Sequence, residues 1–462
     1  MKSSPWRAIV LAAGKGTRMR SRLPKVLHPL AGRPLVLYTL DALAAAGFDA
    51  PVVVVGHRAL EVRQRLGEGF RYAVQRGPAK GTAAALAAAR KQAAGAEQVL
   101  VVNADVPLLT VETLHALQRR HLEAAAAVTL LTARLGQPLG QGRVLRDRYH
   151  RVKGVVEEVQ ASAVQLALRE INVGAYCFRA TWLWEHLAQL RPRAGGELYL
   201  TDLVGLAASQ GQPVEGVPVG DASEALGVND RVQLAQAEAV ARDRIRRRHL
   251  EAGVTIADPA TTYIDADVSI GPDTTLLPNT AIAGASQIGA GCTIGPGAYI
   301  QDSKIGDGGV IRASFVEGAT LESDVQVGPF SHLRPGAYLE SGVRIGSFGE
   351  VKASRLGRDT QMHHFGYVGD ADIGADVNIG AGTITCNYDG VRKNKTVVED
   401  NVLLGSDTLL VAPVKVGKGA STGAGAVVTR DVAPATVVAG VPARVLVGKR
   451  PPQRRRGRPQ DA

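Results

Sequence analysis

The chain has 462 residues, enough for about three domains of ordinary size. Apolar residues make up 45% of it and charged residues 21%, a balance that excludes wholesale disorder. The formal net charge is +11, but the tail Gly448–Ala462 contributes six basic residues and one acidic residue, so the remainder carries only +6. This modest excess argues against nucleic-acid binding.

The cysteine count and the amino-terminal segment indicate the cellular compartment of the protein. Three cysteines without a C-x-x-C spacing argue against a disulfide scaffold or a structural zinc site. The apolar run Ala8–Ala13 is too short for a signal peptide or a membrane span. We therefore expect a cytoplasmic protein that has no membrane partner.

The first half, residues 1–228, alternates apolar segments with amphipathic or alanine-rich ones. This order predicts an α/β domain, Rossmann-like, with a mostly parallel sheet and helices on both faces. The strands are predicted at Arg7–Ala13, Pro51–Val55 and Gln98–Val102, and the helices at Pro34–Ala46 and Gly81–Ala94.

Residues 229–253 are predicted to form a linker helix. Asn229-Asp230 is a typical helix cap, no Gly or Pro interrupts Arg231–Ala252, and Gly253 ends the segment. The basic stretch Arg242–His249 is compatible with nucleic-acid binding, but a solvated helix face between two domains is the favoured interpretation.

The pattern changes over residues 254–447, where aliphatic residues recur every six positions and are often followed by glycine. A period of six cannot be helical; it predicts hexapeptide repeats wound into a left-handed parallel β-helix, in which neighbouring coils bury one another's faces. Two interruptions, Arg358–Tyr367 and Cys386–Thr396, are predicted as loops suited to function. Residues 448–462 are predicted to be a disordered basic tail. The first regular run is Ile264, Ile270, Leu276, Ile282, Ile288, Ile294 and Ile300.

A glycine-rich turn follows the first predicted strand, with the sequence Leu11-Ala12-Ala13-Gly14-Lys15-Gly16-Thr17-Arg18-Met19 and, further on, Pro24-Lys25. Its backbone N–H groups suit phosphate binding. A Rossmann fingerprint would need glycine at Met19, and a P-loop would need Ser or Thr at Gly16, so both fail. The whole string resembles the sugar-1-phosphate nucleotidyltransferase family.

That resemblance implies a set of site residues in the first half. Arg18 and Lys25 would supply positive charge to the triphosphate, and Mg²⁺ would be held by Asp105 and Asn229. Taken alone, Asp105 is equally compatible with a turn and Asn229 with a helix cap. The nucleotide and sugar would be bound by Leu11, Ala12, Ala13, Gly14, Lys25, Gln75, Gly81, Thr82, Gly140, Glu157, Asn172 and Asn229.

Strings in the second half, His363–Asp370, Gly380–Gly390 and Leu333–Gly336, resemble the acetyltransferase half of a bacterial bifunctional family. Its members acetylate glucosamine-1-phosphate with acetyl-CoA and then uridylylate N-acetylglucosamine-1-phosphate with UTP, which makes UDP-N-acetylglucosamine for cell-envelope polymers. The resemblance implies a homotrimer with acetyltransferase sites between adjacent β-helices.

Within that resemblance His364 is the general base, because a neutral imidazole can take a proton from the sugar amine near pH 7. Arg334, Lys352 and Lys393 would hold the sugar phosphate. The residues assigned to orienting the sugar are Tyr367 and Asn378, and those assigned to acetyl-CoA are Asn387, Tyr388, Ser406, Ala424 and Arg444.

Three other interpretations stay open at this point. His332, His363 and His364 could be zinc ligands, although adjacent histidines seldom bind one ion well. Asn103-Ala104 stands where relatives usually have Tyr-Gly, so another sugar or nucleotide such as dTTP is an alternative. The third is a β-helix assembly scaffold without catalysis.

Overall fold

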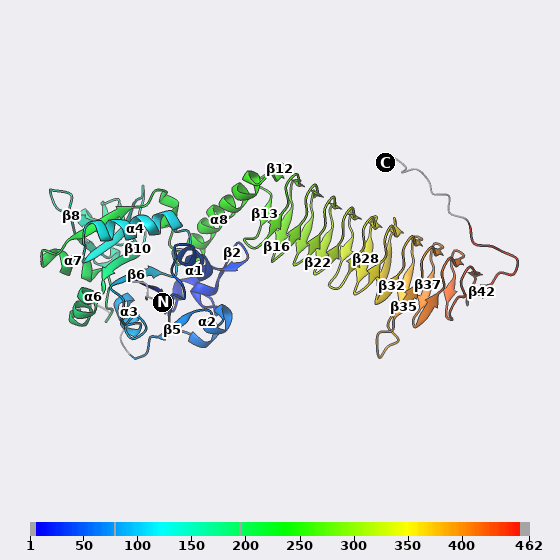
Figure 1. Cartoon of the computed structure of the whole chain (residues 1–462), viewed down its shortest axis with the longest axis horizontal. Helices are drawn as coiled ribbons and strands as arrows, with labels where there is room; N and C mark the ends of the chain where they lie inside the picture. Colours follow the sequence, from blue (N-terminus) through cyan, green and yellow to red (C-terminus); the bar gives the residue numbers. More distant parts are fainter. Residues whose placement is uncertain (1–5, 78–79, 194–195, 453–462) are drawn as a thin grey trace. The chain divides into compact units, whose positions relative to one another are not determined.

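The computed structural model describes residues 6–77, 80–193 and 196–452. It divides the chain into two compact units, residues 1–241 and 242–462. The boundary falls within the helix α8 (Arg231–Glu251), which agrees with the helix predicted there (Figure 1). The predicted tail is described as far as Pro452, and the rest of it lies outside the described residues.

Unit 1 is built on one sheet with the strand order β11-β7-β10-β6-β1-β4-β5. Every strand on this path runs parallel to β1 except β10, which is antiparallel to both neighbours, so the predicted mostly parallel sheet is confirmed. The hairpin β8 (Arg143–Arg146) and β9 (Val152–Val156) pairs beside β10. The path strands are β1 (Trp6–Ala12), β4 (Val52–Val55), β5 (Arg71–Val74), β6 (Gln98–Asn103), β7 (Val128–Arg134), β10 (Glu170–Arg179) and β11 (Val214–Pro218).

Helices cover both faces of this sheet, as the sequence predicts. Successive side chains of a strand point to opposite faces, so Val10 packs in one apolar core and Ile9 in the other. The first core takes residues from α1 (Leu35–Ala45), α2 (Ala59–Leu66) and α4 (Val111–Glu123). The second takes residues from α3 (Thr82–Ala88), α6 (Ala180–His186) and α7 (Asp202–Ser209).

The predicted helix Gly81–Ala94 is shorter in the structure, since α3 ends at Ala88. Beyond it the backbone bonds tighten to a three-residue spacing, with the N–H of Arg90 donating to the carbonyl of Ala87 at 3.2 Å. The alanines continue as turns up to Gly95. Alanine is compatible with both conformations, which is why helix propensity alone overestimates the length.

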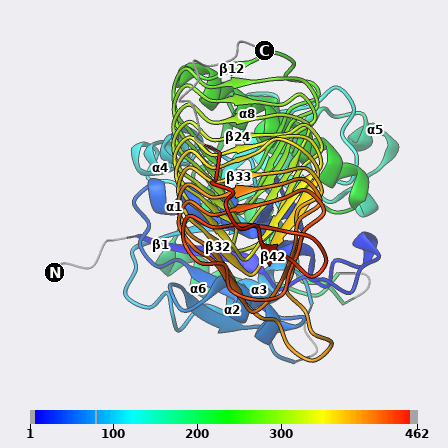
Figure 2. The same cartoon turned by 90° about the vertical axis from the view of Figure 1, so that its right-hand side faces the viewer.

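Unit 2 is the predicted β-helix. Its 31 strands, β12 (Thr255–Ile256) to β42 (Arg444–Val445), have two to four residues each and form three sheets of 12, 10 and 9 strands. The coils stack one behind another (Figure 2). Their strands pair in parallel register; for example, Leu276 lies beside Ile294, and both are buried. The inward aliphatic side chains therefore form continuous columns, which confirms the meaning of the six-residue period.

One of the two predicted interruptions is wrong. Residues 358–367 are an ordinary part of a coil, because β30 (Gln361–Met362) and β31 (Gly366–Gly369) pair with the coils on either side. Met362 is buried and fills the inward position, which a six-residue pattern of Ile, Leu and Val does not mark. The second interruption is real: residues 387–395 form a loop between β34 (Ile384–Cys386) and β35 (Thr396–Val398).

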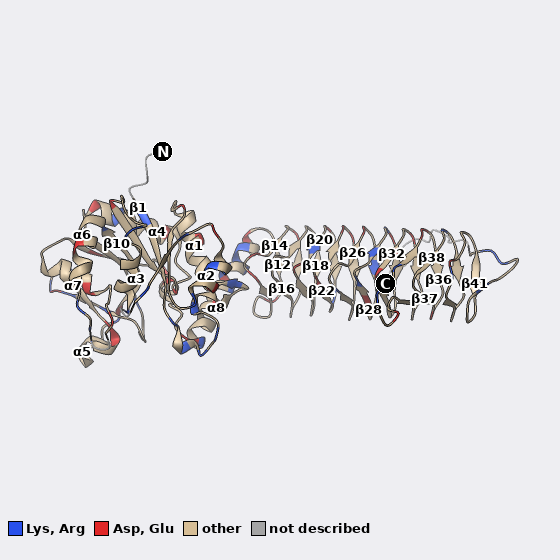
Figure 3. Cartoon of the chain, turned by 90° about the horizontal axis from the view of Figure 1, so that it is seen from below, with Lys and Arg blue, Asp and Glu red and all other residues tan. Residues whose placement is uncertain are grey.

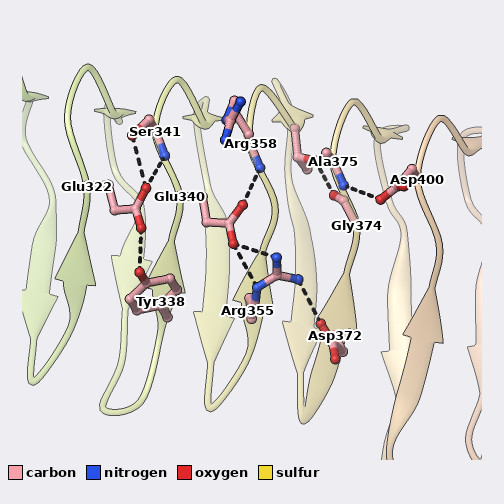
Figure 4. A network of polar contacts seen from close by, with 11 residues as sticks. Glu322, Tyr338, Glu340, Ser341, Arg355, Arg358, Asp372, Gly374, Ala375 and Asp400 are labelled. Atoms are coloured by element: carbon pink, nitrogen blue, oxygen red, sulfur yellow. Dashed lines mark hydrogen bonds and ion pairs between the residues drawn. The ribbon is translucent and has the colours of Figure 1, made fainter.

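Polar side chains secure one edge of the stacked coils (Figure 4). The Glu340 carboxylate accepts from the backbone N–H of Arg358 at 2.9 Å and from the guanidinium of Arg355, which also bonds to Asp372 at 3.1 Å. Asp372 in turn accepts from Lys395 at 3.4 Å. This chain of contacts ties the end of the loop 387–395 to the coils beneath it.

The basic stretch of α8 contacts the first coil. Arg242 donates to the carbonyl of Ile264 at 3.0 Å and to Asp265 at 3.2 Å, and its guanidinium lies 5.4 Å from the centre of the Tyr263 ring. Figure 3 shows where the charged residues lie along both units. Part of this stretch therefore serves packing, in line with the favoured interpretation. None of the described helices combines the length and apolar composition that a membrane crossing requires.

Candidate functional site

A cavity of about 770 Å³ lies in unit 1, around the carboxyl ends of β1 and β6. Crevices at this edge of a parallel sheet are the usual ligand sites of open α/β folds. Ten of the predicted residues line it: Leu11, Ala12, Ala13, Gly14, Arg18, Lys25, Gln75, Gly81, Thr82 and Asp105.

Two glycines give this cavity its shape. Gly16 has a left-handed φ of 61°, and a Cβ there would lie 2.6 Å from the Cβ of Lys25. Gly81 has a φ of 96°, and a Cβ there would lie 2.3 Å from the carbonyl oxygen of Leu198. Any other residue would push the glycine-rich turn away from Lys25, or α3 away from the segment that covers it.

The two predicted metal ligands converge on one cation. The Lys25 ammonium lies 2.5 Å from Oδ2 of Asp105 and 3.2 Å from Oδ1 of Asn229. A carboxylate and an amide oxygen thus face one point of positive charge, although they are separated by more than 120 residues in sequence. Hard oxygen donors of this kind suit Mg²⁺, which takes the rest of its shell from water and phosphates.

The predicted sugar residues lie outside the cavity lining. Glu157 accepts from the Thr201 hydroxyl at 2.7 Å, and burial raises the pKa of its carboxyl group. The Asn172 amide donates to the Tyr176 hydroxyl at 2.7 Å. Burial and nearby carboxylates raise the pKa of Tyr199, a lining residue, to about 12, and Glu157 is among those carboxylates. Gly140 is also outside the lining; its N–H donates to Glu158.

Sequence reasoning missed several lining residues, including Lys15, His57, Lys80, Glu197 and Tyr199. The segment that carries Glu197 and Tyr199 is hydrogen-bonded to the residues just before α3: the N–H of Leu198 donates to the carbonyl of Lys80 at 2.9 Å. No local pattern in the sequence marks a contact of this range.

Asn103, one of the departures from the family pattern, also lines the cavity. Its Oδ1 atom is buried and has no hydrogen-bond partner among the described residues. Its Nδ2 atom fills space beside Gly174, where a Cβ would lie 2.5 Å from it. Asn103 therefore leaves, in the lining of the cavity, a buried hydrogen-bond acceptor that no described residue uses.

In unit 2 the structure brings together the three cationic residues predicted to hold the sugar phosphate. Arg334 and Lys352 follow paired positions of β25 (His332–Leu333) and β28 (Gly349–Lys352). The Lys352 ammonium, by hydrogen bonding and repulsion, lowers the pKa of Lys393. An anion between the two lysines would relieve that repulsion. We call Arg334, Lys352 and Lys393 the cationic cluster.

Two predicted polar residues border the cationic cluster. The Asn387 amide donates to the Tyr367 hydroxyl at 3.3 Å and to Asp370 at 2.5 Å. Asp370 lies 3.8 Å from the Lys352 ammonium. Tyr388 belongs to the same loop; it is 62% exposed and donates to the carbonyl of Gly390.

His364, Ser406 and Ala424 lie in one column on a corner of the β-helix. The strands before them pair in register, Gln361 with Asn378, Asn378 with Leu403, and Leu403 with Ser421, and each site residue follows three positions later. The spacing of ~4.8 Å between strands places Ser406 roughly 10 Å from His364, two coils away. All three are exposed, and so is Arg444 on the last strand β42.

The predicted acetyltransferase residues are therefore divided between two places in unit 2. One is the column that holds His364, Ser406 and Ala424, and the other is the cationic cluster with its neighbours. Among the described residues, no hydrogen bond or ion pair joins His364 or Ser406 to the cationic cluster. His332 is bound to Glu317 at 2.7 Å and His363 to Gln361 at 3.1 Å. No group of three His, Cys, Asp or Glu side chains that could hold a metal ion occurs in the described part of this one chain.

Comparisons with known proteins agree with both halves. A family model for the MobA-like NTP transferase domain matches residues 8–195, and one for the bacterial transferase hexapeptide matches residues 267–302. The chain is 47% identical to the bifunctional protein GlmU of Heliobacterium modesticaldum over 92% of this chain and 93% of that protein. It is 48% identical to that of Pelobacter propionicus over 92% and 93%. It is 46% identical to that of Kineococcus radiotolerans over 96% and 91%.

Fold, cavity and matches define a nucleotidyltransferase joined to a hexapeptide-repeat acyltransferase. The identities over almost the whole chain show that it belongs to the GlmU family of bifunctional enzymes. Its function is accordingly the synthesis of UDP-N-acetylglucosamine by a uridyltransferase and an acetyltransferase.

Proposed function

We propose that the cavity of unit 1 binds UTP and N-acetylglucosamine-1-phosphate and that Asp105 and Asn229 hold Mg²⁺ beside the triphosphate. The observation that carries this proposal is the convergence of both oxygen donors on one cationic point, the Lys25 ammonium. When bound, the metal ion would neutralise charge on the phosphates.

The protein side chains then act mainly by positioning and charge. An oxygen of the sugar phosphate attacks the α-phosphorus of UTP, the bond to the β-phosphate breaks, and pyrophosphate leaves. Arg18 and Lys25, both in the cavity lining, stabilise the negative charge that develops on the phosphates. The glycine-rich turn orients the nucleotide, so no protein nucleophile is needed.

In unit 2 we assign acetyl transfer from acetyl-CoA to glucosamine-1-phosphate. The sugar amine attacks the thioester carbonyl, the carbon–sulfur bond breaks, and coenzyme A leaves as the thiol. His364 takes the proton from the amine, and Ser406 stabilises the oxyanion. The cationic cluster binds the phosphate of the sugar. This step supplies the N-acetylated sugar phosphate that unit 1 consumes.

We further propose that the active assembly is a cytoplasmic homotrimer. Phe330 and Phe348 are 62% and 63% exposed and stack at 5.5 Å, and Phe365 on the same corner is 56% exposed. An exposed aromatic row of this kind favours a protein interface. A second copy would also bring further groups to His364, whose side chain stands apart from the cationic cluster within one chain.

The proposal is tested by mass spectrometry of one reaction that contains glucosamine-1-phosphate, acetyl-CoA, UTP and Mg²⁺. The wild type is expected to form UDP-N-acetylglucosamine. His364→Ala should stop before acetylation, and Asp105→Ala should accumulate N-acetylglucosamine-1-phosphate. A wild type that forms neither product would contradict the assignment of both sites.

The selectivity of unit 1 for UTP can be tested at Asn103, which departs from the family pattern. Asn103 presents a buried acceptor without a partner at the edge of the cavity. The discriminating experiment compares kcat/KM for UTP and dTTP with the same sugar phosphate. We expect UTP to be preferred, because the chain belongs to a family of uridyltransferases; a preference for dTTP would contradict this selectivity.

A further inference from the structure

We propose that Glu224 is a positioning residue that sets the separation of the Asp105 and Asn229 oxygens. It lies in the short helix η5 (Ala222–Ala225), is only 2% exposed, is not a lining residue of the cavity, and has its hydrogen bonds with Thr110 and Thr113. The inference rests on the proposed function, because it takes Asp105 and Asn229 to be the metal pair.

The Glu224 carboxylate joins two distant segments. Oε2 accepts from the backbone N–H of Thr110 at 2.8 Å and from its hydroxyl at 3.0 Å. Oε1 accepts from the hydroxyl of Thr113 at 2.9 Å. Thr110 is the N-cap of α4, and its hydroxyl also accepts from the N–H of Thr113. A buried carboxylate with three donors holds its neighbours firmly, because losing any of them leaves a buried polar atom unpaired.

The residues joined by the Glu224 carboxylate lie at the same sequence distance from the two metal ligands. Asp105 precedes Thr110 by five residues, and Asn229 follows Glu224 by five residues. Next to the pair itself, the N–H of Val228 donates to the carbonyl of Asp105 at 2.8 Å. The two segments that carry the ligands are thus fastened to each other at both ends.

The packing around the two segments leaves little freedom between these fastenings. Leu108 is 3% exposed and Val228 is fully buried, and both belong to one apolar cluster with α8. If the contacts of Glu224 are lost, the segment 221–229 can shift relative to β6, and the carboxylate and amide oxygens no longer face one point. Groups hydrogen-bonded to a metal ligand typically change metal affinity by about 10- to 100-fold, and Glu224, which acts through the segments that carry the ligands, should lie at the lower end of that range.

The test uses Glu224→Gln in the full-length chain, since glutamine keeps the shape but loses the charge and one acceptor oxygen, so the Thr113 hydroxyl must turn to accept from the amide. We expect the Mg²⁺ concentration for half-maximal uridyl transfer to rise about 10-fold, with acetyl transfer unchanged. Mn²⁺ binding in the presence of UTP alone, followed by electron paramagnetic resonance without turnover, should weaken by the same factor. Glu238→Gln is the matched control, because Glu238 also links two segments of unit 1 by accepting from the N–H of Ala31 at 2.8 Å.

A purely structural role would lower the melting temperature of Glu224→Gln and leave both metal measurements at the wild-type value, which would overturn the inference. If that variant does not fold, Thr113→Val decides, since it removes one donor only and should shift both measurements in the same direction. Asp105→Ala tests the metal pair independently of Glu224. If this variant leaves Mn²⁺ binding unaltered, the assignment of Asp105 and Asn229 as metal ligands is wrong.

Discussion

The two units place their functional residues in contrasting ways. In unit 1, residues as far apart in sequence as Leu11 and Tyr199 meet in one cavity, because parallel strands end at one edge of a sheet and loops converge there. In unit 2, the stacked coils place residues in straight columns, so His364 and Ser406 stand in line rather than around a space. A sheet edge can enclose a ligand within one chain, whereas a regular solenoid offers faces that a second surface must complete.

The largest effect is expected from His364→Ala, which removes the proposed general base. Acetyl transfer should fall about 100- to 10,000-fold, the usual contribution of such a group, while uridyl transfer from supplied N-acetylglucosamine-1-phosphate stays constant. The thiol release assay for coenzyme A measures this directly. His363→Gln is the matched control, and an equal loss in that variant would mean that the assignment to His364 is wrong.

Asp105→Ala should reduce uridyl transfer about 100- to 1000-fold, because a charged ligand beside the phosphates is lost and Lys25 loses its partner. Pyrophosphate release reports the rate. Acetyl transfer in the same preparation serves as the control, and a parallel loss of both activities would show that the two units are not functionally separate.

Phe348→Glu tests whether the second surface in unit 2 is another copy of this chain. A carboxylate in the aromatic row should dissociate the trimer, since burying it would cost several kcal/mol at an apolar contact, on the order of what two Phe side chains contribute. Sedimentation should show monomers, with acetyl transfer lost and uridyl transfer retained. Leu60→Glu, at a comparably exposed apolar site of unit 1, should change neither; active monomers would contradict a shared site.

A smaller effect concerns the stability of unit 1 in acid. Burial lowers the pKa of His121 from 6.5 to about 4, with a further contribution from Arg179. Below pH 6.5 the imidazole is protonated in the unfolded chain but stays neutral in the folded chain. The free energy of unfolding is therefore unaffected by this group above pH 6.5 and falls progressively between pH 6.5 and about pH 4. The integrated loss is about 3 kcal/mol.

Tryptophan fluorescence can follow this loss, because the Trp6 ring lies 5.9 Å from that of His121. Denaturant unfolding between pH 7 and pH 4 should show a steeper decline for the wild type than for His121→Gln. His115→Gln, an exposed histidine of the same helix, should behave like the wild type. Equal slopes for wild type and His121→Gln would refute the role of burial.

Much of the fold could be predicted because its signals are local. The period of six residues and the alternation of apolar segments each involve neighbours in sequence, and both were confirmed. The predicted loop at 358–367 is wrong because Met362 takes an inward position that an unbranched side chain can fill as well as isoleucine. Contacts between distant segments, such as Leu198 with Lys80 or Glu224 with Thr110, leave no periodic trace and could come only from the structure.

Under the proposed assignment, the two activities reside in separate sites that are linked only by the sugar phosphate they share. The most direct test mixes purified His364→Ala and Asp105→Ala proteins in a reaction with glucosamine-1-phosphate, acetyl-CoA, UTP and Mg²⁺. Each variant alone should form no UDP-N-acetylglucosamine, and the mixture should form it, because N-acetylglucosamine-1-phosphate released by one protein is used by the other. A mixture that stays inactive while each variant retains its own half reaction would contradict the separation of the two sites.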